Sequence, residues 1–201
     1  ARLSGEPFLP MTRFHHLYWL AAGLVALPVW GAGIQAPGVP NFHQVNATIY
    51  RGAQPTREGW ESLSKLGVTM VIDLRRERED REHFTNAEQR AVEAAGMRYI
   101  NVPMNGIVAP SDAQVAKVLA VFDSGQKVFV HCRQGKDRTG TVIACYRIAH
   151  DHWQNRKALQ EAKSYGMHFI DIGMKRYIEH FQPAAQLPPV EAGLQPAAVV
   201  P

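Results

Sequence analysis

A cysteine and an arginine six positions apart in this sequence have the residue types and the spacing for phosphate chemistry. Cys132 follows His131 at the end of an apolar run, and Arg138 begins an Arg-Thr-Gly triplet that opens a predicted helix. A thiolate, the nucleophilic form of cysteine, is favoured at a helix N-terminus near cations. The planar guanidinium of arginine can hold two oxygens of a phosphoryl group. We therefore predict that Cys132 is a nucleophile and that Arg138 binds phosphate.

The residues between these two side chains are suited to an anion-binding loop. Successive backbone N–H groups in a tight turn form a concave anion site, and the N-terminus of the following helix adds unpaired N–H groups. Gly135 permits the curl of the loop, and Gly140 is expected to permit close packing of the helix on the sheet. The remaining predicted substrate-binding residues are His131, which we expect to orient the loop, and Arg133, Gln134 and Lys136.

Cleavage of a phosphate ester also needs a group that protonates the leaving oxygen, and two carboxyl groups are candidates. Asp137 lies inside the loop, whereas Asp112 lies after the preceding predicted strand, where a helix is predicted to begin. Each also has a structural interpretation, because Asp137 can brace the loop and Asp112 can stabilise a helix N-terminus. Of the two we favour Asp137. The Thr139 hydroxyl is predicted to donate to the thiolate and help Cys132 leave.

Strand and helix patterns alternate through the part of the chain that would position these residues. We expect strands at 47–51, 68–74, 97–102 and 127–131, and helices at 56–66, 86–95, 111–122, 139–150, 156–165 and 172–181. Strands separated by helices predict an α/β fold with a central, mostly parallel sheet and helices on both faces. Ligands of such sheets bind at the carboxyl ends of strands, which is where the loop between strand and helix stands.

Other polar residues receive structural interpretations. Arg51 and Asp73 end predicted neighbouring strands and are expected to form a buried ion pair. The charged run 75–82 is expected to be solvated. His150 and His152 do not share a helix face, so no metal site is predicted there.

The two ends of the chain differ in composition from the rest. Residues 1–36 hold a basic start after Met11, an apolar stretch and small residues, which is typical of an upstream segment with a secretory signal peptide. Residues 183–201 are rich in Pro and Ala and are predicted to be a disordered tail. This division leaves 37–182 as the catalytic domain. We expect an exported protein, periplasmic or secreted; a membrane-anchored or a cytoplasmic protein is the alternative.

Length, charge and cysteine content indicate the number of domains, the partners and the state of the cysteines. The 201 residues suffice for one domain with its own core. The formal net charge is +4, with no dense basic run between aromatics, so no nucleic-acid partner is expected. Cys145 lies about two helical turns into the predicted helix, roughly 10 Å along its axis, so it is expected to be a buried thiol rather than a disulfide partner of Cys132. We expect a monomer that needs no cofactor or metal and is not stably inserted in a membrane after processing.

The pattern His-Cys, five residues, Arg-Thr resembles the cysteine-based protein tyrosine and dual-specificity phosphatases. Residues 135–140, Gly-Lys-Asp-Arg-Thr-Gly, resemble bacterial and lipid-directed branches, and 49–55 and 71–75 resemble compact, atypical dual-specificity members. The resemblance implies hydrolysis of phosphomonoesters in two steps through a phosphocysteine, without a metal. The implied substrate is a phosphorylated protein. Lys136 and Asp137 favour an alternative, an inositol phosphate or phosphoinositide.

Two other classes of function use a comparable loop. Rhodanese-type sulfurtransferases also place a cysteine in an anion-cradling loop, but the extra loop residue and the Arg-Thr-Gly ending favour phosphate. A module that binds phosphorylated ligands without turnover would not require intact Cys132, Arg138 and Thr139 together.

Overall fold

The computed structural model of the chain describes residues 34–77 and 85–183. The expected signal segment and the expected tail therefore lie almost wholly outside the described residues, as does the second half of the charged run. Across the two described ranges, no helix combines the length and the apolar character needed to cross a membrane.

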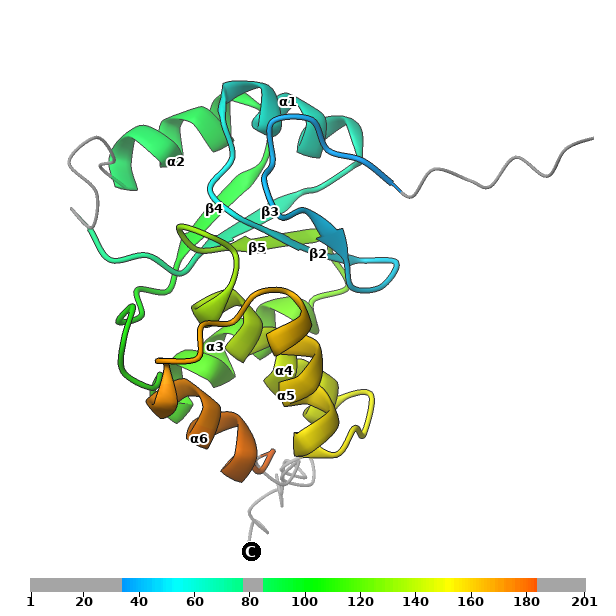
Figure 1. Cartoon of the computed structure of the whole chain (residues 1–201). Helices are drawn as coiled ribbons and strands as arrows, with labels where there is room; N and C mark the ends of the chain where they lie inside the picture. The colour runs from blue at the N-terminus through cyan, green and yellow to red at the C-terminus, as the bar shows by residue number, and fades with distance from the viewer. Residues whose placement is uncertain (1–33, 78–84, 184–201) are drawn as a thin grey trace, which may run out of the picture. The chain divides into compact units, whose positions relative to one another are not determined.

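A five-stranded sheet forms the centre of the described chain, in the order β1-β2-β5-β3-β4 (Figure 1). The strands are β1 (His43–Gln44), β2 (Ile49–Gly52), β3 (Met70–Asp73), β4 (Arg98–Asn101) and β5 (Val128–His131). Only β1 runs antiparallel to its neighbour, so the predicted mostly parallel sheet is confirmed. The carboxyl ends of β2, β5, β3 and β4 consequently open at one edge of the sheet.

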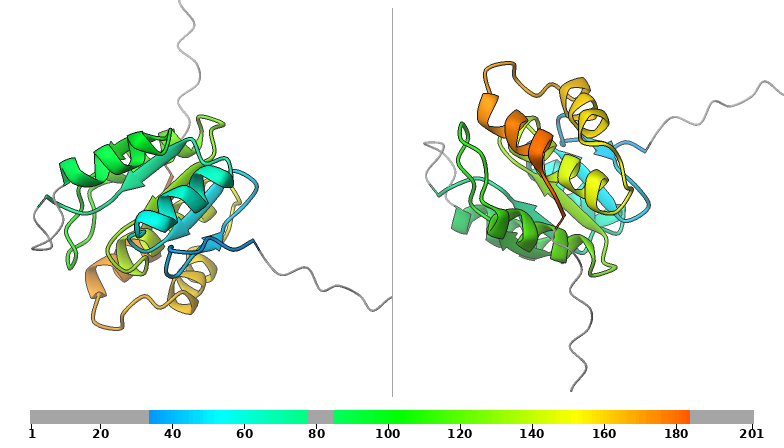
Figure 2. Two further views of the ribbon diagram at one scale, coloured as in Figure 1. Left: turned by 90° about the horizontal axis from the view of Figure 1, so that it is seen from above. Right: turned by 90° about the horizontal axis from the view of Figure 1, so that it is seen from below.

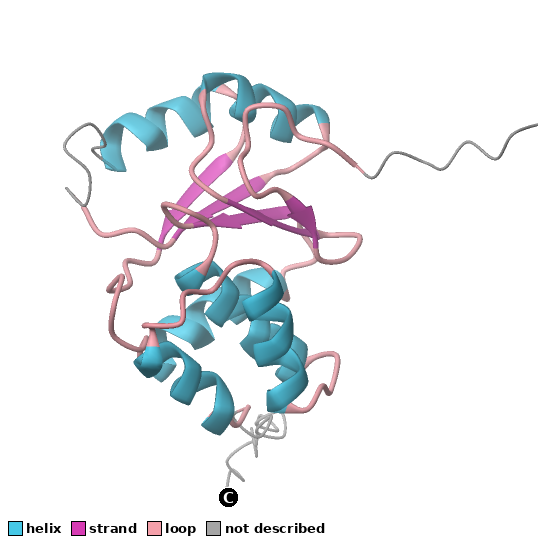
Figure 3. Cartoon of the chain, in the orientation of Figure 1, coloured by secondary structure: helices cyan, strands magenta, loops and turns pink. Residues whose placement is uncertain are grey.

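Helices cover both faces of the sheet, as predicted (Figures 1 and 3). One face carries α1 (Arg57–Lys65) and α2 (Thr85–Ala94); the other carries α3 (Asp112–Phe122), α4 (Asp137–Ala149), α5 (Asn155–Ser164) and α6 (Ile172–His180). Figure 2 shows the same two layers from above and below. Alternation along the strands builds both cores, since Phe129 of β5 packs with Trp60 of α1, whereas Val130 packs with Val142 of α4.

The connection from β4 to α3 is fixed by one glutamine. Ser111 caps α3 in a capping box with Gln114, whose side chain accepts from the Ser111 backbone N–H (2.8 Å). The same Gln114 amide donates to the carbonyl of Pro103 (2.6 Å). Both ends of the β4–α3 loop are thus tied to one side chain.

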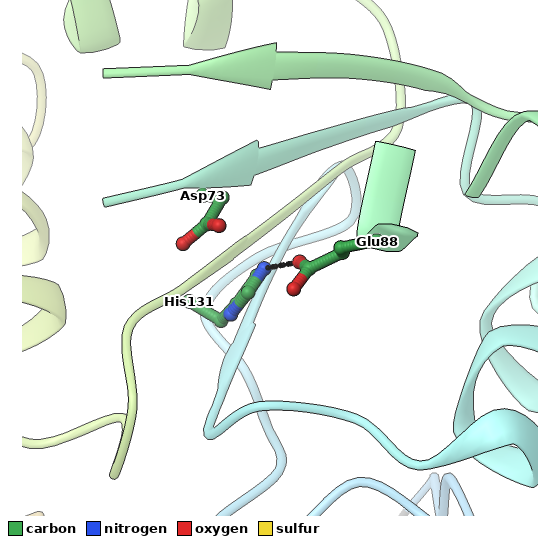
Figure 4. Close-up of side chains that lie close together, drawn as sticks. All are labelled: Asp73, Glu88 and His131. Carbon is green, nitrogen blue, oxygen red and sulfur yellow. Dashed lines mark ion pairs between the residues drawn. The ribbon is translucent and has the colours of Figure 1, made fainter. Parts of the chain in front are cut away.

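A buried ionic network joins the carboxyl ends of β3 and β5 to α2 (Figure 4). Arg75 donates to Asp73 through Nε (3.0 Å) and Nη2 (2.9 Å), and also pairs with Glu88. His131 Nε2 lies 2.8 Å from Glu88 Oε1. The Arg75 guanidinium and the His131 ring therefore face two carboxylates in a space closed to solvent, which makes the burial of these groups tolerable.

This network corrects two of the expectations. The expected Arg51–Asp73 ion pair is wrong, because β5 lies between β2 and β3 and separates the two residues. Asp73 pairs instead with Arg75, which was expected to be solvated but is only 3% exposed. Arg75 is buried because its backbone N–H (2.9 Å) and its guanidinium both bind the Asp73 carboxylate.

The pKa values within the network follow from its charges. Burial alone would lower the pKa of His131, but the carboxylates of Glu88 and Asp73 outweigh burial and raise it above its ordinary value. Burial would likewise raise the pKa of Asp73, but His131 and Arg75 hold it below its usual range. The two carboxylates thus favour the protonated form of His131 in the folded state, just before the loop.

The raised pKa of His131 predicts a pH dependence of stability. A raised folded-state pKa contributes stability that is complete below the unfolded value, about 6.5, and is lost as pH rises through the folded value. Glu88→Gln removes one of the carboxylates responsible, so the difference in unfolding free energy between wild type and variant should shrink as pH rises above about 6.5. The slope is at most about 1.4 kcal/mol per pH unit, the value for one proton.

Urea denaturation from pH 6 to 9 measures this difference. Arg75 stays charged throughout, so loss of its contact with Glu88 only adds a constant offset. Glu61→Gln, a substitution on the exposed side of α1, is the matched control and should run parallel to wild type. Parallel curves for Glu88→Gln as well would contradict a charged His131.

Candidate active site

The predicted loop lies between β5 and α4, directly at the carboxyl edge of the sheet. Cys132 follows the last residue of β5 and is 3% exposed. Helix α4 begins at Asp137, two residues before the expected start, so Arg138 and Thr139 lie in its first turn. Cys132 thus lies between the end of strand β5 and the N-terminus of α4, and a helix leaves its first N–H groups free to bind an anion.

The carbonyl groups of this loop are bound from outside the loop. The bonds are Gln54 N to Arg133 O (3.2 Å), Asn41 Nδ2 to Gln134 O (3.3 Å), Asn41 Nδ2 to Gly135 O (3.1 Å) and Arg51 Nη2 to Gly135 O (2.8 Å). The described chain contains no cis peptide bond, so each N–H points opposite to the carbonyl of its own peptide unit. The N–H groups of Gln134, Gly135 and Lys136 therefore face away from these donors, as an anion-binding nest requires.

Gly135 is required by both conformation and space. Its φ of +68° lies in the region that favours glycine, and a Cβ there would stand 2.4 Å from the backbone of Gly52. The loop therefore lies directly against the end of β2.

Arg51, on β2, places a buried cation behind the loop. Its guanidinium is stacked 4.4 Å from the centre of the Tyr165 ring, and the residue is 1% exposed. Burial lowers the pKa of Arg51 to about 10, which leaves it charged at neutral pH. It both holds the Gly135 carbonyl and adds positive potential on the outer side of the loop.

Three other predicted site residues, Arg138, Thr139 and His131, are buried like Cys132. Arg138 is buried, and its Nη1 donates to the carbonyl of Met104 in the β4–α3 loop (3.4 Å). His131 Nδ1 lies 3.3 Å from the Cys132 carbonyl, and its predicted orienting role stays a prediction. The Thr139 hydroxyl is fully buried and makes no hydrogen bond within the described residues, so the expected bond to Cys132 is not formed in this structure.

Asp137 is bound by His168, a residue that sequence reasoning missed. Asp137 Oδ1 accepts from the His168 backbone N–H (2.7 Å), and Oδ2 lies 2.7 Å from His168 Nδ1. Burial would raise the pKa of Asp137, but its interactions with His168 and with the side chain of Asp171 outweigh burial and lower the pKa. Asp171 lies 3.8 Å from the same ring nitrogen, and burial and the Asp137 carboxylate raise the pKa of Asp171 to about 6.

Asp112, the other candidate acid, is held differently. It is exposed at the start of α3 and accepts a hydrogen bond from the Tyr177 hydroxyl of α6 (2.8 Å). Burial and Asp112 together raise the pKa of Tyr177. The carboxylate of Asp112 therefore links two helices.

The remaining predicted residues of the loop differ in their exposure and packing. Arg133 and Gln134 are exposed, and the Lys136 stem lies against Gly166. A Cβ at Gly140 would stand 3.3 Å from Met167 and 3.4 Å from Ala162, so Gly140 allows close packing on α5 and the segment after it rather than on the sheet, contrary to expectation. Cys145 is buried as predicted, and burial raises the pKa of its thiol.

Two groups of His and carboxylate side chains in the described ranges are close enough to share a cation. They are Asp73 with Glu88 and His131, and Asp137 with His168 and Asp171. Arg75 pairs with both carboxylates of the first group, and His168 binds Asp137 in the second through its backbone and its ring. Neither group requires a metal to explain its geometry.

Comparison with known proteins places this site in a family. "Dual specificity protein phosphatase TpbA" of Pseudomonas aeruginosa (strain UCBPP-PA14) is 28% identical over 143 residues, which cover 69% of this chain and 60% of TpbA. The chain thus spans about 60% of that relative's length. "Phosphatidylglycerophosphatase and protein-tyrosine phosphatase 1" of Rattus norvegicus is 28% identical over 155 residues, 71% of this chain and 80% of the relative.

Solved structures share the fold. The crystal structure of P. aeruginosa TpbA has a TM-score of 0.62 at 24% identity and covers 75% of this chain and 89% of its own. The core catalytic domain of the PP-IP phosphatase SIW14 from S. cerevisiae, in complex with citrate, has a TM-score of 0.62 at 22% identity, covering 74% and 89%. Residues 35–179 match the family described as "DSP-PTPase phosphatase fused to NAD+ Kinase", and this chain belongs to that family of dual-specificity-type phosphatase domains.

Proposed function

We propose that this chain hydrolyses phosphomonoesters through a phosphocysteine intermediate on Cys132. The observation that carries the proposal is the loop whose carbonyls are tied outward, so that its N–H groups face the side opposite their donors. Cys132 and Arg138 stand at the two ends of that loop. A phosphoryl group has three oxygens that such a ring of donors can hold while charge shifts during transfer.

The reaction follows in two steps. The Cys132 thiolate attacks phosphorus, the bond from phosphorus to the ester oxygen breaks, and that oxygen leaves with a proton. Water then attacks the phosphocysteine, the P–S bond breaks, and inorganic phosphate and the thiolate are released. The buried Thr139 hydroxyl, without a partner in the described structure, is available to donate to the departing sulfur. Arg138 grips the phosphoryl oxygens in both steps.

For the proton donor we propose the Asp137–His168 pair over Asp112. Asp137 Oδ2 lies 2.7 Å from His168 Nδ1, so the carboxylate can accept from that ring nitrogen and orient the ring. Within the described ranges the other ring nitrogen, Nε2, has no hydrogen-bond partner and the side chain is 40% exposed, so it can exchange protons with a leaving group and with water. The bond from Tyr177 makes Asp112 the weaker candidate.

For the substrate we propose phosphotyrosine in a protein, with other phosphorylated residues as further substrates. The relatives named as dual-specificity and protein-tyrosine phosphatases support this choice. An inositol phosphate is the second candidate, supported by the position of Lys136 beside the loop and by the likeness to a PP-IP phosphatase.

The mechanism predicts metal-independent turnover that depends on one of the two cysteines. With chelator and reductant present, wild type should hydrolyse p-nitrophenyl phosphate, and Cys132→Ser should lose all measurable activity. Arg138→Lys should lower kcat/KM by about 10²- to 10³-fold, because a point charge replaces a bidentate grip on the transition state. Cys145→Ala, the matched cysteine variant, should keep its activity.

Other outcomes would redirect the assignment. Turnover that survives Cys132→Ser would mean that the nucleophile lies elsewhere. Thiosulfate:cyanide transfer without phosphatase activity would indicate a sulfurtransferase, and binding of phosphopeptides without hydrolysis would indicate a recognition module.

The proposed proton donor predicts a dependence on the leaving group. p-Nitrophenolate leaves without a proton, whereas phenolate needs one. His168→Gln and Asp137→Asn should therefore lower kcat on phenyl phosphate by about 10²- to 10⁴-fold, with a much smaller effect on p-nitrophenyl phosphate. The double variant should be no worse than the single ones, because the two residues act as a unit. The same selective loss in Asp112→Asn, with His168→Gln unaffected, would move the role to Asp112.

A further inference from the structure

Exposed apolar side chains gather on two loops beside the phosphate-binding loop. Of the six large apolar side chains exposed in the described ranges, five lie there. They are Ile107 (75% exposed) and Val108 (55%) on the β4–α3 loop, and Phe169 (86%), Ile170 (66%) and Ile172 (58%) between α5 and the start of α6. We call these five the apolar rim. Exposed apolar side chains grouped on neighbouring segments mark a contact site more often than ones scattered singly do.

Each loop of the rim is bonded to the phosphate-binding loop. Arg138 donates to the Met104 carbonyl on the β4–α3 loop. Asp137 accepts from the backbone and faces the ring of His168, which directly precedes Phe169. The rim is therefore built onto the same residues that would hold the phosphate and its proton donor.

The two loops also lie against each other. A Cβ added to Gly173, at the start of α6, would stand 3.3 Å from the backbone nitrogen of Ala109. Figure 1 shows the β4–α3 loop beside the start of α6. The backbones of the two loops are thus in contact, which brings the apolar residues of one loop near those of the other.

The rim is exposed although its backbone is held in place. Asn105 Oδ1 accepts from the N–H groups of Ile107 (2.8 Å) and Val108 (3.3 Å). Lys175 Nζ donates to the Phe169 carbonyl (2.6 Å). Three backbone groups of the rim are thus bonded to nearby side chains, while the large apolar side chains are presented to solvent, so exposure does not result from an unanchored chain.

A phosphate-binding loop beside an apolar surface matches an amphiphilic ligand. The cationic loop takes the phosphate, and the group attached to it meets side chains that carry no charge. A soluble polyphosphate would leave the rim in water and gain nothing from it, whereas a hydrocarbon would remove apolar surface on both partners from water. We propose that the apolar rim binds the hydrocarbon chain of the substrate and so selects phosphomonoesters that carry one.

This inference rests on the proposed hydrolysis of phosphomonoesters, and it adds esters with a hydrocarbon chain to the phosphotyrosine and inositol phosphate candidates. A methylene that is fully buried strengthens binding by about fourfold. On an open rim one side of the chain stays in water, so about twofold per methylene is expected. The gain should end once the chain outgrows the rim.

The test is hydrolysis of ethyl, butyl, hexyl and octyl phosphate, each below its critical micelle concentration. These monoesters share nearly the same leaving group, so chain length changes binding and little else. We expect kcat/KM to rise by about twofold per methylene, or about 16-fold from butyl to octyl phosphate. Phe169→Ser combined with Ile170→Ser should abolish the rise and leave ethyl phosphate unchanged. Ile34→Ser, at the sixth exposed apolar residue, should keep the full rise.

The outcomes separate this inference from the proposed function. Two results would overturn the role of the rim while the phosphatase assignment stands. One is hydrolysis at the same rate for all chain lengths. The other is cleavage of a soluble inositol polyphosphate faster than octyl phosphate, by wild type and rim variant alike. Should no ester be hydrolysed at all, calorimetry of ethyl and octyl phosphate with Cys132→Ser decides, because equal dissociation constants would refute the rim. Flat kinetics with vesicle binding lost in the rim variant would assign the surface to a bilayer instead.

Discussion

The bond from the buried Arg51 guanidinium to the Gly135 carbonyl is the interaction on which the loop depends. A guanidinium taken out of water is costly, and no carboxylate is bonded to this one within the described residues. In return, the buried guanidinium fixes the orientation of the Gly135 carbonyl. A carbonyl held outward by a cation cannot turn toward the anion site, and the trans peptide then turns the next N–H inward. Asn41 and Gln54 hold the carbonyls of neighbouring peptide units outward in the same way. The anion site is therefore defined by bonds made on its outer surface.

Strand β5 is supported by Arg51 on its β2 side and by a buried ionic network on its β3 side. On the β2 side Arg51 pairs in register with Val130, two residues before the nucleophile. On the β3 side Asp73 is in register with His131, and the network of Asp73, Arg75, Glu88 and His131 closes the end of the strand. Charges on the β3 side balance one another, whereas the Arg51 cation is not balanced by a bonded carboxylate. The net positive potential therefore lies beneath the loop rather than beside the strand, where it favours an anionic ligand.

What could be predicted from sequence was local, and what was missed depends on strand order. The loop, its flanking strand and helix, and the buried Cys145 each follow from patterns within a few residues of one another. The Arg51–Asp73 pair failed because periodicity does not reveal that β5 inserts between β2 and β3. Arg75 was misjudged because a charged run is usually solvated, and Glu88 arrives only through the packing of α2. His168 lies 31 residues from Asp137 with no spacing that would mark the pair.

Asp137 connects the parts of the site that would perform chemistry and selection. It belongs to the phosphate-binding loop, it holds His168 by backbone and side chain, and Phe169 and Ile170 follow His168 directly. A substrate chain lying on these two side chains would press on the segment that positions the His168 ring. Binding energy from a part of the substrate remote from phosphorus would then serve to orient the proton donor, which raises kcat and not only affinity. The phosphate-binding loop and the rim would therefore act together, because the Asp137 carboxylate joins the loop to the segment that carries Phe169 and Ile170.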